Sequence, residues 1–210
     1  EKINGIFLTH AHIGHYLGLD QLGQEVIGSK KIKVYCMQRM FDFLSNNGPW
    51  DQLIKLQNII LEKIQNELTI KLNSRISITP ILVPHRDEYS ETVCYLVSTM
   101  KKKLLYIPDI DKWHLWDKDI KEMIKIVDYA LLDGTFYQDG ELSRDMSKIP
   151  HPFVKESMML FKDLSKQNKQ KVFFTHLNHT NPLIIKESKE QFEVKKLGFN
   201  FAMDNLVLEL

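Results

Sequence analysis

Apolar segments of four to eight residues alternate with polar turns along the whole chain, and other segments place apolar residues three or four positions apart. The first pattern is typical of buried strands and the second of amphipathic helices. We therefore predict strands at 3–9, 32–36, 59–61, 68–72, 76–83, 93–99, 103–107, 127–132, 171–175 and 206–210, and helices at 16–27, 38–58 (broken at 47–49), 112–126, 154–168 and 183–196. Runs of strands followed by alternating strands and helices predict an α/β fold of two packed sheets with helices outside.

Three histidines follow the first predicted strand. His10, His12 and His15 lie on the turn between that strand and the next predicted helix, where their side chains can converge. Imidazole is the commonest nitrogen ligand of zinc and related metals, and short spacing supplies several ligands at once. The alternative is a set of solvated loop histidines. We predict a metal site.

Two further candidate ligands also follow predicted strands. His85 comes just after 76–83, where a single histidine is commonly structural or exposed, and Asp109 comes just after 103–107. A carboxylate beside a dication stays ionised and offsets part of the metal charge. We assign Asp109 to the metal and Asp111 to capping the helix predicted at 112–126.

The last predicted strands are also followed by residues that can bind a metal or transfer a proton. Asp133 follows 127–132, and His176 follows 171–175. His151 lies between two prolines, in a segment that also reads as an ordinary loop. For His179 a second ligand, a substrate contact and a turn residue are equally open, and the surrounding Asn and Pro residues favour the turn.

The histidine cluster resembles the H-x-H-x-D-H signature of the metallo-β-lactamase superfamily, with Gly14 in place of the aspartate. The resemblance implies an αββα sandwich with two mixed sheets packed face to face. It also implies that His10, His12 and His85 bind one ion, while His15, Asp109 and His176 complete a second position. Gly14 offers no side-chain oxygen, which weakens that second position.

Residues 132–136, 147–152 and 175–182 resemble the B-protein branch of pyrroloquinoline quinone biosynthesis, a member of the same superfamily near the phosphodiesterases and the tRNA 3′-processing enzymes. In the phosphodiesterase branch an acidic residue pairs with a histidine near the leaving group. Asp133 and His151 occupy the matching positions, so the resemblance implies that they are catalytic.

The resemblance implies a metal-dependent hydrolase that holds one or two Zn²⁺ ions, with Fe²⁺ or Mn²⁺ as alternatives. Metal-activated water would attack a phosphodiester or an ester/acyl centre. The alternative function is an iron-dependent oxygenase acting on a tyrosine-derived peptide or quinone precursor. A third reading is a zinc-stabilised binding protein without turnover.

Composition narrows the remaining possibilities. With 210 residues we expect a single domain over 1–210, and a net charge of +1 argues against a nucleic-acid partner. No apolar run is long enough for a membrane span. Cys36 and Cys94 lie in apolar, strand-like segments typical of buried thiols, so we expect a cytoplasmic protein. We also expect a small-molecule or peptide substrate. The chain is compatible with a homodimer.

The chain opens without methionine, directly into the strand that precedes the histidines. In the superfamily that it resembles, several strands normally come before this strand. We therefore expect that N-terminal strands are missing from this chain, and the missing segment could have carried a signal peptide.

Overall fold

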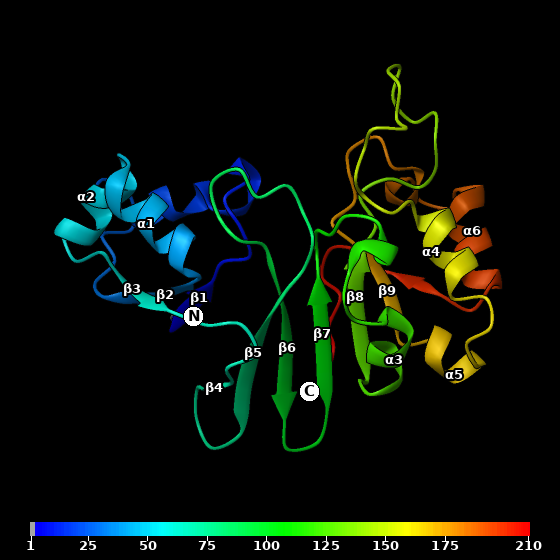
Figure 1. The fold of residues 1–210 in the computed structure, drawn as a ribbon, viewed down its shortest axis with the longest axis horizontal. Helices are drawn as coiled ribbons and strands as arrows, with labels where there is room; N and C mark the ends of the chain where they lie inside the picture. The colour runs from blue at the N-terminus through cyan, green and yellow to red at the C-terminus, as the bar shows by residue number, and fades with distance from the viewer. Residues whose placement is uncertain (1–2) are drawn as a thin grey trace. The chain divides into compact units, whose positions relative to one another are not determined.

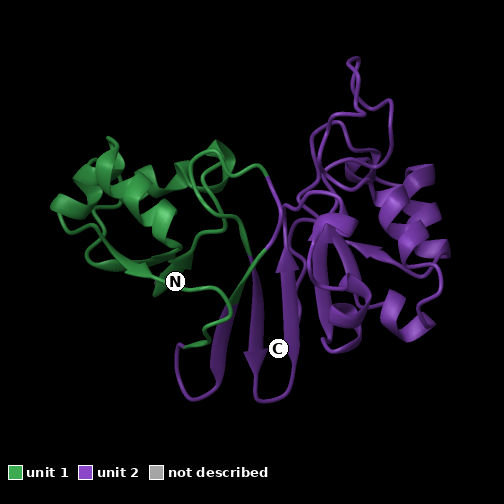
Figure 2. Cartoon of the chain, viewed as in Figure 1, with its two compact units in different colours: residues 1–70, 80–82, 86–93 green, residues 71–79, 83–85, 94–210 purple. Residues whose placement is uncertain are grey.

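The computed structural model describes residues 3–210. The chain divides into two compact units (Figure 2): unit 1 comprises residues 1–70, 80–82 and 86–93, and unit 2 comprises residues 71–79, 83–85 and 94–210. Each unit has a sheet and helices of its own, so the fold is α/β as predicted. The expectation of a single domain over 1–210 stays a prediction.

Unit 1 contains a three-stranded sheet of β1 (Gly5–Phe7), β2 (Ile32–Cys36) and β3 (Ile59–Lys63), in that order (Figure 1). Both pairings are parallel, and parallel neighbours need a crossover connection. Helices α1 (Gln38–Asn46) and α2 (Trp50–Lys55) provide that connection between β2 and β3, and they are separated at 47–49 as predicted. Eleven buried residues of this unit pack into a hydrophobic core: Leu8, Ala11, Tyr16, Leu19, Leu22, Val34, Cys36, Met40, Leu44, Leu53 and Ile59.

The α-helix predicted over 16–27 is wrong. Two 3₁₀ helices, η1 (Ile13–His15) and η2 (Leu17–Leu22), occupy the start of this segment, and a turn follows them. Leu19 and Leu22 are buried, whereas Val26 is exposed, so the three residues do not form one buried face. Buried residues three apart suit the three-residue turn of a 3₁₀ helix, and the glycines in this segment weaken an α-helix.

The second sheet has seven strands in the order β10-β9-β8-β7-β6-β5-β4. They are β4 (Ile70–Lys71), β5 (Ile76–Leu82), β6 (Val93–Thr99), β7 (Lys103–Ile107), β8 (Tyr129–Asp133), β9 (Val172–Thr175) and β10 (Asn200–Phe201). Strands β6 and β7 pair antiparallel, and β7 to β10 pair in parallel. The mixed pairing therefore belongs to this sheet, while both pairings of the three-stranded sheet are parallel.

Three of the predicted long helices are shorter or interrupted. In place of 112–126 the structure has η3 (Trp113–Leu115) and α3 (Ile120–Lys125); in place of 154–168, α4 (Val154–Leu160) and α5 (Lys166–Lys169); in place of 183–196, η4 (Pro182–Ile184) and α6 (Lys189–Lys196). Each later helix has its own capping side chain, from Asp119, Ser165 and Ser188 respectively. A capping side chain satisfies the first unpaired N–H groups, so each cap marks a new helix start.

The strand predicted at 206–210 is also wrong. The last strand is β10, which pairs with β9 through Asn200 opposite Phe173, and the Ala202 N–H donates to the Phe174 carbonyl at 2.8 Å. Val207 is 83% exposed, although its segment is apolar in sequence. Hydrophobicity alone predicted the wrong segment as the last strand, because β10 occupies the position beside β9 in the sheet.

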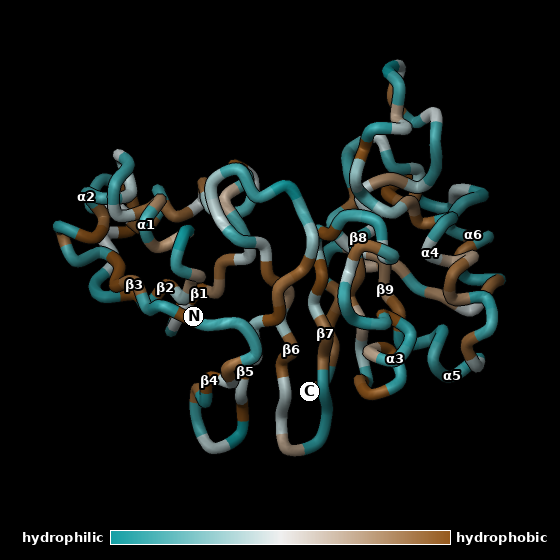
Figure 3. Tube along the Cα trace, viewed as in Figure 1, coloured by the Kyte–Doolittle hydropathy of each residue, from teal (hydrophilic) through white to brown (hydrophobic). Residues whose placement is uncertain are grey.

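Strands β7, β8 and β9 place their carboxyl ends along one edge of the larger sheet, since parallel neighbours run in the same direction. β8 and β9 consist mainly of apolar residues (Figure 3), as expected of strands buried inside an α/β domain. In open α/β sheets ligands bind beyond this carboxyl edge. Over residues 3–210 no helix has the length and apolar character that a membrane crossing requires.

Candidate metal centre

The carboxyl edge of the larger sheet brings three of the predicted site residues together. Asp109 lies two residues beyond β7, Asp133 is the last residue of β8, and His176 directly follows β9. Asp109 and Asp133 are 3% and 0% exposed. Nδ1 of His176 lies 3.4 Å from Oδ1 of Asp109. Burial of two carboxylates costs free energy unless charged or hydrogen-bonding partners compensate it. This edge of the sheet is therefore a candidate site for metal binding or proton transfer.

The loops that leave β8 and β9 are packed tightly against each other. The Gly134 N–H donates to the Thr175 carbonyl at 2.9 Å, and a Cβ at Gly134 would lie 2.9 Å from Cβ of Phe174. Asn181 is fully buried, and its side-chain amide donates to the Gly134 carbonyl at 2.6 Å. Only a glycine fits between these two strand ends, which explains the Asp-Gly-Thr sequence.

His176 adopts a left-handed backbone conformation, with φ of +59°. This conformation is uncommon for residues other than glycine and persists only where the surroundings hold it. Nδ1 of His176 lies 2.9 Å from the hydroxyl oxygen of Thr135, which itself is buried. The imidazole is therefore held at a fixed orientation at the end of β9.

Asp133 and His151 form a direct pair, as the family resemblance implied. Nδ1 of His151 lies 2.8 Å from Oδ2 of Asp133, and the same oxygen accepts the Ile110 N–H at 3.1 Å. The other carboxylate oxygen accepts both the N–H and the hydroxyl of Thr135, at 2.9 and 2.8 Å. Each oxygen of this buried carboxylate thus has two partners, and the His151 ring is fixed by one of them.

His85 lies in a second carboxylate pair. Its Nδ1 is 3.0 Å from Oδ1 of Asp111, so the assignment of Asp111 to helix capping is wrong. The 3₁₀ helix that begins nearby has Lys112 as its N-cap residue and no side-chain cap. Burial lowers the pKa of His85 below the ordinary histidine value, against the opposing charge of Asp109. A neutral imidazole is the form that binds a metal.

His85, Asp109 and His151 can each offer one ligand atom such that all three atoms lie within 4.8 Å of one another. Two imidazole nitrogens and one carboxylate oxygen form a donor set that suits zinc and also iron. His151 therefore has two open roles, as a ligand beside Asp109 and as the proton donor that Asp133 orients. Its Nδ1 is 3.5 Å from Oδ1 of Asp109.

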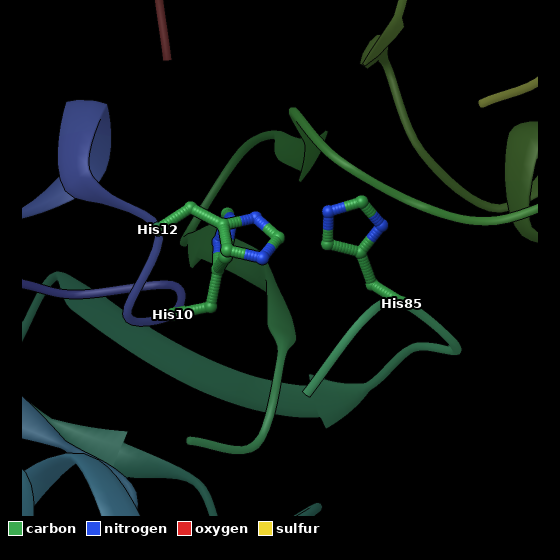
Figure 4. A group of neighbouring side chains, drawn as sticks. All are labelled: His10, His12 and His85. Carbon is green, nitrogen blue, oxygen red and sulfur yellow. The ribbon is translucent and has the colours of Figure 1, made fainter. Parts of the chain in front are cut away.

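In the histidine cluster of unit 1, the rings also contact each other and neighbouring oxygen-bearing side chains. Nε2 of His10 lies 2.8 Å from Nδ1 of His12, and Figure 4 shows these two rings. Nδ1 of His10 contacts the Thr9 hydroxyl at 3.1 Å, and Nε2 of His12 contacts Glu88 at 3.1 Å. Two nitrogens on one tetrahedral zinc ion, each bound at about 2.0–2.1 Å, lie about 3.3 Å apart. The nitrogen pair is close to that spacing.

Four of the candidate ligand histidines share one feature that fits a metal site. In His10, His12, His85 and His176, one ring nitrogen contacts an oxygen of a neighbouring side chain. Metal-binding histidines almost always make such a bond, because it fixes the tautomer and turns the other nitrogen towards the metal. The residues present therefore fit a bound metal ion in their chemistry and in their local orientation.

The remaining predicted positions are distributed as follows. The His15 ring centroid lies 4.2 Å from that of His10. Gly14 precedes His15 in η1, and a Cβ added to it would meet no atom within 4 Å. His179 is exposed in the loop after β9, which agrees with a turn residue and leaves its other two roles open. Both cysteines are buried free thiols, as predicted.

Comparison with known proteins decides the family. The sequence matches the family model described as "Beta-lactamase superfamily domain" over residues 1–177. The chain belongs to the β-lactamase superfamily. It is 24% identical to coenzyme PQQ synthesis protein B of Methylorubrum extorquens (strain PA1), over 99% of this chain and 73% of that protein.

Solved structures agree with this superfamily. The Zn²⁺-bound PqqB from Methylobacterium extorquens superposes with a TM-score of 0.80 at 23% identity, covering 99% of this chain and 73% of that one. Unliganded yeast PDE1 superposes with a TM-score of 0.62 at 11% identity, covering 95% of this chain and 66% of that one. The fold is therefore the metallo-β-lactamase fold, as the sequence predicted.

Sequence reasoning missed the residues that orient the histidines. Thr9, Glu88 and Thr135 were not identified, and Asp111 was given another role. Thr9 and Thr135 lie beside or within motifs that the sequence analysis used, so their positions were a usable signal. Glu88 lies 76 residues from His12, and only the folded chain reveals that contact.

Proposed function

We propose that this chain is a metal-dependent hydrolase of the superfamily, similar to coenzyme PQQ synthesis protein B. Its substrate would be a phosphodiester or an ester/acyl compound. The observation that carries the proposal is the contact of 2.8 Å between His151 and the fully buried Asp133, at the same sheet edge as Asp109. It supplies a proton donor beside a candidate metal ligand.

The proposed ligands follow the superfamily pattern residue by residue. Support comes from the family match, from the carboxylate partner of His85 and from the paired nitrogens of His10 and His12. A bound ion supplies Lewis acidity and lowers the pKa of water towards neutrality. We propose Zn²⁺, in one or two ions, bound by His10, His12, His15, His85, Asp109 and His176.

The chain's own residues would handle the leaving group. Asp133 accepts from Nδ1 of His151, and a carboxylate in that position stabilises the doubly protonated ring. The proton on Nε2 of His151 is then the one given to the departing oxygen. A pocket of about 370 Å³ lies beside His176 and is lined by both polar and apolar residues, among them Thr175, Leu177, Ile184 and Asp204, and it provides room for part of a substrate.

A second function is supported by one observation. His85, Asp109 and His151 form a set of two histidines and one carboxylate, which is the donor set of many non-haem iron oxygenases. The relatives named coenzyme PQQ synthesis protein B point to a biosynthetic pathway that makes a quinone. The alternative is therefore an iron-dependent oxygenase acting on a tyrosine-derived peptide or quinone precursor.

Metal analysis after anaerobic purification, followed by two activity assays, distinguishes these functions. For a hydrolase we expect bound Zn²⁺ and cleavage of bis(p-nitrophenyl) phosphate or a p-nitrophenyl ester. Iron with oxygen consumption in the presence of a tyrosine-containing peptide would instead favour the oxygenase. His85→Ala and Asp109→Ala should lose metal, whereas His114→Ala, at an exposed histidine outside the site, should retain it.

Metal-free protein after purification in the presence of Zn²⁺ or Fe²⁺, with no gain of thermal stability from either ion, would contradict both functions. A bound ion stabilises the folded state by mass action, so the thermal shift is a readout independent of any substrate.

A further inference from the structure

Thr135 joins two parts of the candidate site, His176 and the Asp133–His151 pair. Its hydroxyl oxygen lies 2.9 Å from Nδ1 of His176 and 2.8 Å from Oδ1 of Asp133. The other oxygen of Asp133 holds His151 at 2.8 Å. One buried hydroxyl thus connects the candidate ligand at the end of β9 with the proposed proton-donor pair.

The direction of these hydrogen bonds follows from the groups involved. A carboxylate only accepts, so the Thr135 hydroxyl donates its single proton to Asp133. The hydroxyl oxygen can then only accept from His176, so Nδ1 of that ring carries a proton. In the neutral form of the ring, the lone pair is consequently on Nε2.

The backbone holds Thr135 in place independently of its side chain. Its N–H donates to Oδ1 of Asp133 at 2.9 Å, and its carbonyl accepts the Asn178 N–H at 3.0 Å. The residue is only 8% exposed, so water does not readily replace the hydroxyl. Removal of the hydroxyl should therefore leave the loop in place and remove the side-chain contacts to His176 and to Oδ1 of Asp133.

We propose that Thr135 is a positioning residue that fixes the Nδ1–H tautomer and the orientation of His176, so that Nε2 is presented to a metal ion. This inference rests on the proposed function, because it takes His176 as a ligand. The same hydroxyl donates to the carboxylate that orients His151. The orientations of His176 and His151 therefore both depend on Thr135. Loss of such an outer contact typically weakens metal binding by about 10- to 100-fold.

The test is a titration of metal-free protein with Zn²⁺, in competition with a chromophoric chelator. Thr135→Val keeps the shape of the side chain and removes the hydroxyl, and Thr135→Ser restores the hydroxyl. We expect Thr135→Val to weaken by about 10- to 100-fold the same binding step that His176→Ala abolishes, and Thr135→Ser to bind nearly as wild type. Thr92→Val is a matched control, since Thr92 is buried and its hydroxyl lacks a hydrogen-bond partner among residues 3–210.

A second measurement uses the wild-type protein and needs no variant to fold. Long-range ¹H–¹⁵N correlation spectra of the metal-free protein report which ring nitrogen carries the proton, with His176→Gln used to assign the signal. We expect the proton on Nδ1. Equal Zn²⁺ affinities for Thr135→Val and Thr92→Val, or a proton on Nε2 of His176, would overturn the inference.

These outcomes are separate from a failure of the proposed function. If wild-type protein binds neither Zn²⁺ nor Fe²⁺, the metal-dependent function fails, and the spectra still decide the tautomer. If wild-type protein binds Zn²⁺ and Thr135→Val binds it equally well, the function stands and the role of Thr135 is wrong.

Discussion

Nδ1 of His151 lies 2.8 Å from Oδ2 of Asp133, although 18 residues separate them in the chain. Asp133 is fully buried at the end of β8, and His151 lies in the loop before α4. A carboxylate so placed can act only through a partner, because substrate cannot reach it. The two residues are therefore best treated as one unit, in which the imidazole is the group that would contact substrate.

We expect His151→Ala to reduce hydrolysis by about 10²- to 10⁴-fold with the metal content unchanged, because the proton donor is lost and the ligands remain. Asp133→Asn should show a similar loss of turnover. The double variant should be little worse than either single one, since residues that act as a unit are not additive. Steady-state kinetics and metal analysis of the purified variants check this.

The same experiment decides the second role of His151. Loss of metal from His151→Ala would identify His151 as a ligand beside Asp109, as the spacing of their ligand atoms also allows. Full activity in His151→Ala would leave it an ordinary loop residue.

Gly14→Asp should raise the metal content per chain. A Cβ at Gly14 would meet no atom within 4 Å, so the position can accept a side chain without repacking. The aspartate restores the anionic ligand of the superfamily signature, and the affinity of a divalent ion depends on the number and type of its ligands. Metal analysis after dialysis measures the change. Two ions per chain in the unmodified protein, with no increase in the variant, would contradict the prediction.

Gly134→Ala should destabilise the fold by about 1–3 kcal/mol, the usual cost of overpacking. Its Cβ would approach Cβ of Phe174 to 2.9 Å and the Thr175 carbonyl to 3.0 Å. Neither contact is with a flexible side-chain end, so the two strand ends would have to separate. Urea unfolding measures the loss. Gly18→Ala is the matched control, since nothing lies within 4 Å of the added Cβ, and an equal loss there would remove the packing explanation.

Both cysteines should be unreactive towards Ellman's reagent in the folded protein at pH 7 to 8. Burial raises the pKa of Cys36 to about 12, and burial also raises the pKa of Cys94. The thiolate is the reactive form, and a raised pKa keeps both groups as neutral thiols well above neutral pH. Two thiols per chain should react after denaturation. Rapid reaction of either thiol in the native state would show that its segment opens.

The sequence by itself determined most strands and the positions where chemistry follows them. Short apolar runs predicted β2 and β5 to β9 closely, because burial of a strand demands such residues regardless of its neighbours. The spacing of His10, His12 and His15 and the resemblance built on it led to the correct superfamily. Helix continuity was less predictable, since capping residues such as Ser188 restart a helix inside an apparently continuous pattern.

Only the tertiary structure decided which side chains work together. The sequence suggested Asp133 and His151 as a pair through family resemblance, but it assigned Asp111 to a helix cap, and folding places that carboxylate on His85 instead. Thr135 likewise acquires its role only when the ends of β8 and β9 meet. Hydrogen bonds act over about 3 Å, and the distance between two side chains is set by strand pairing and loop packing, which no local pattern contains.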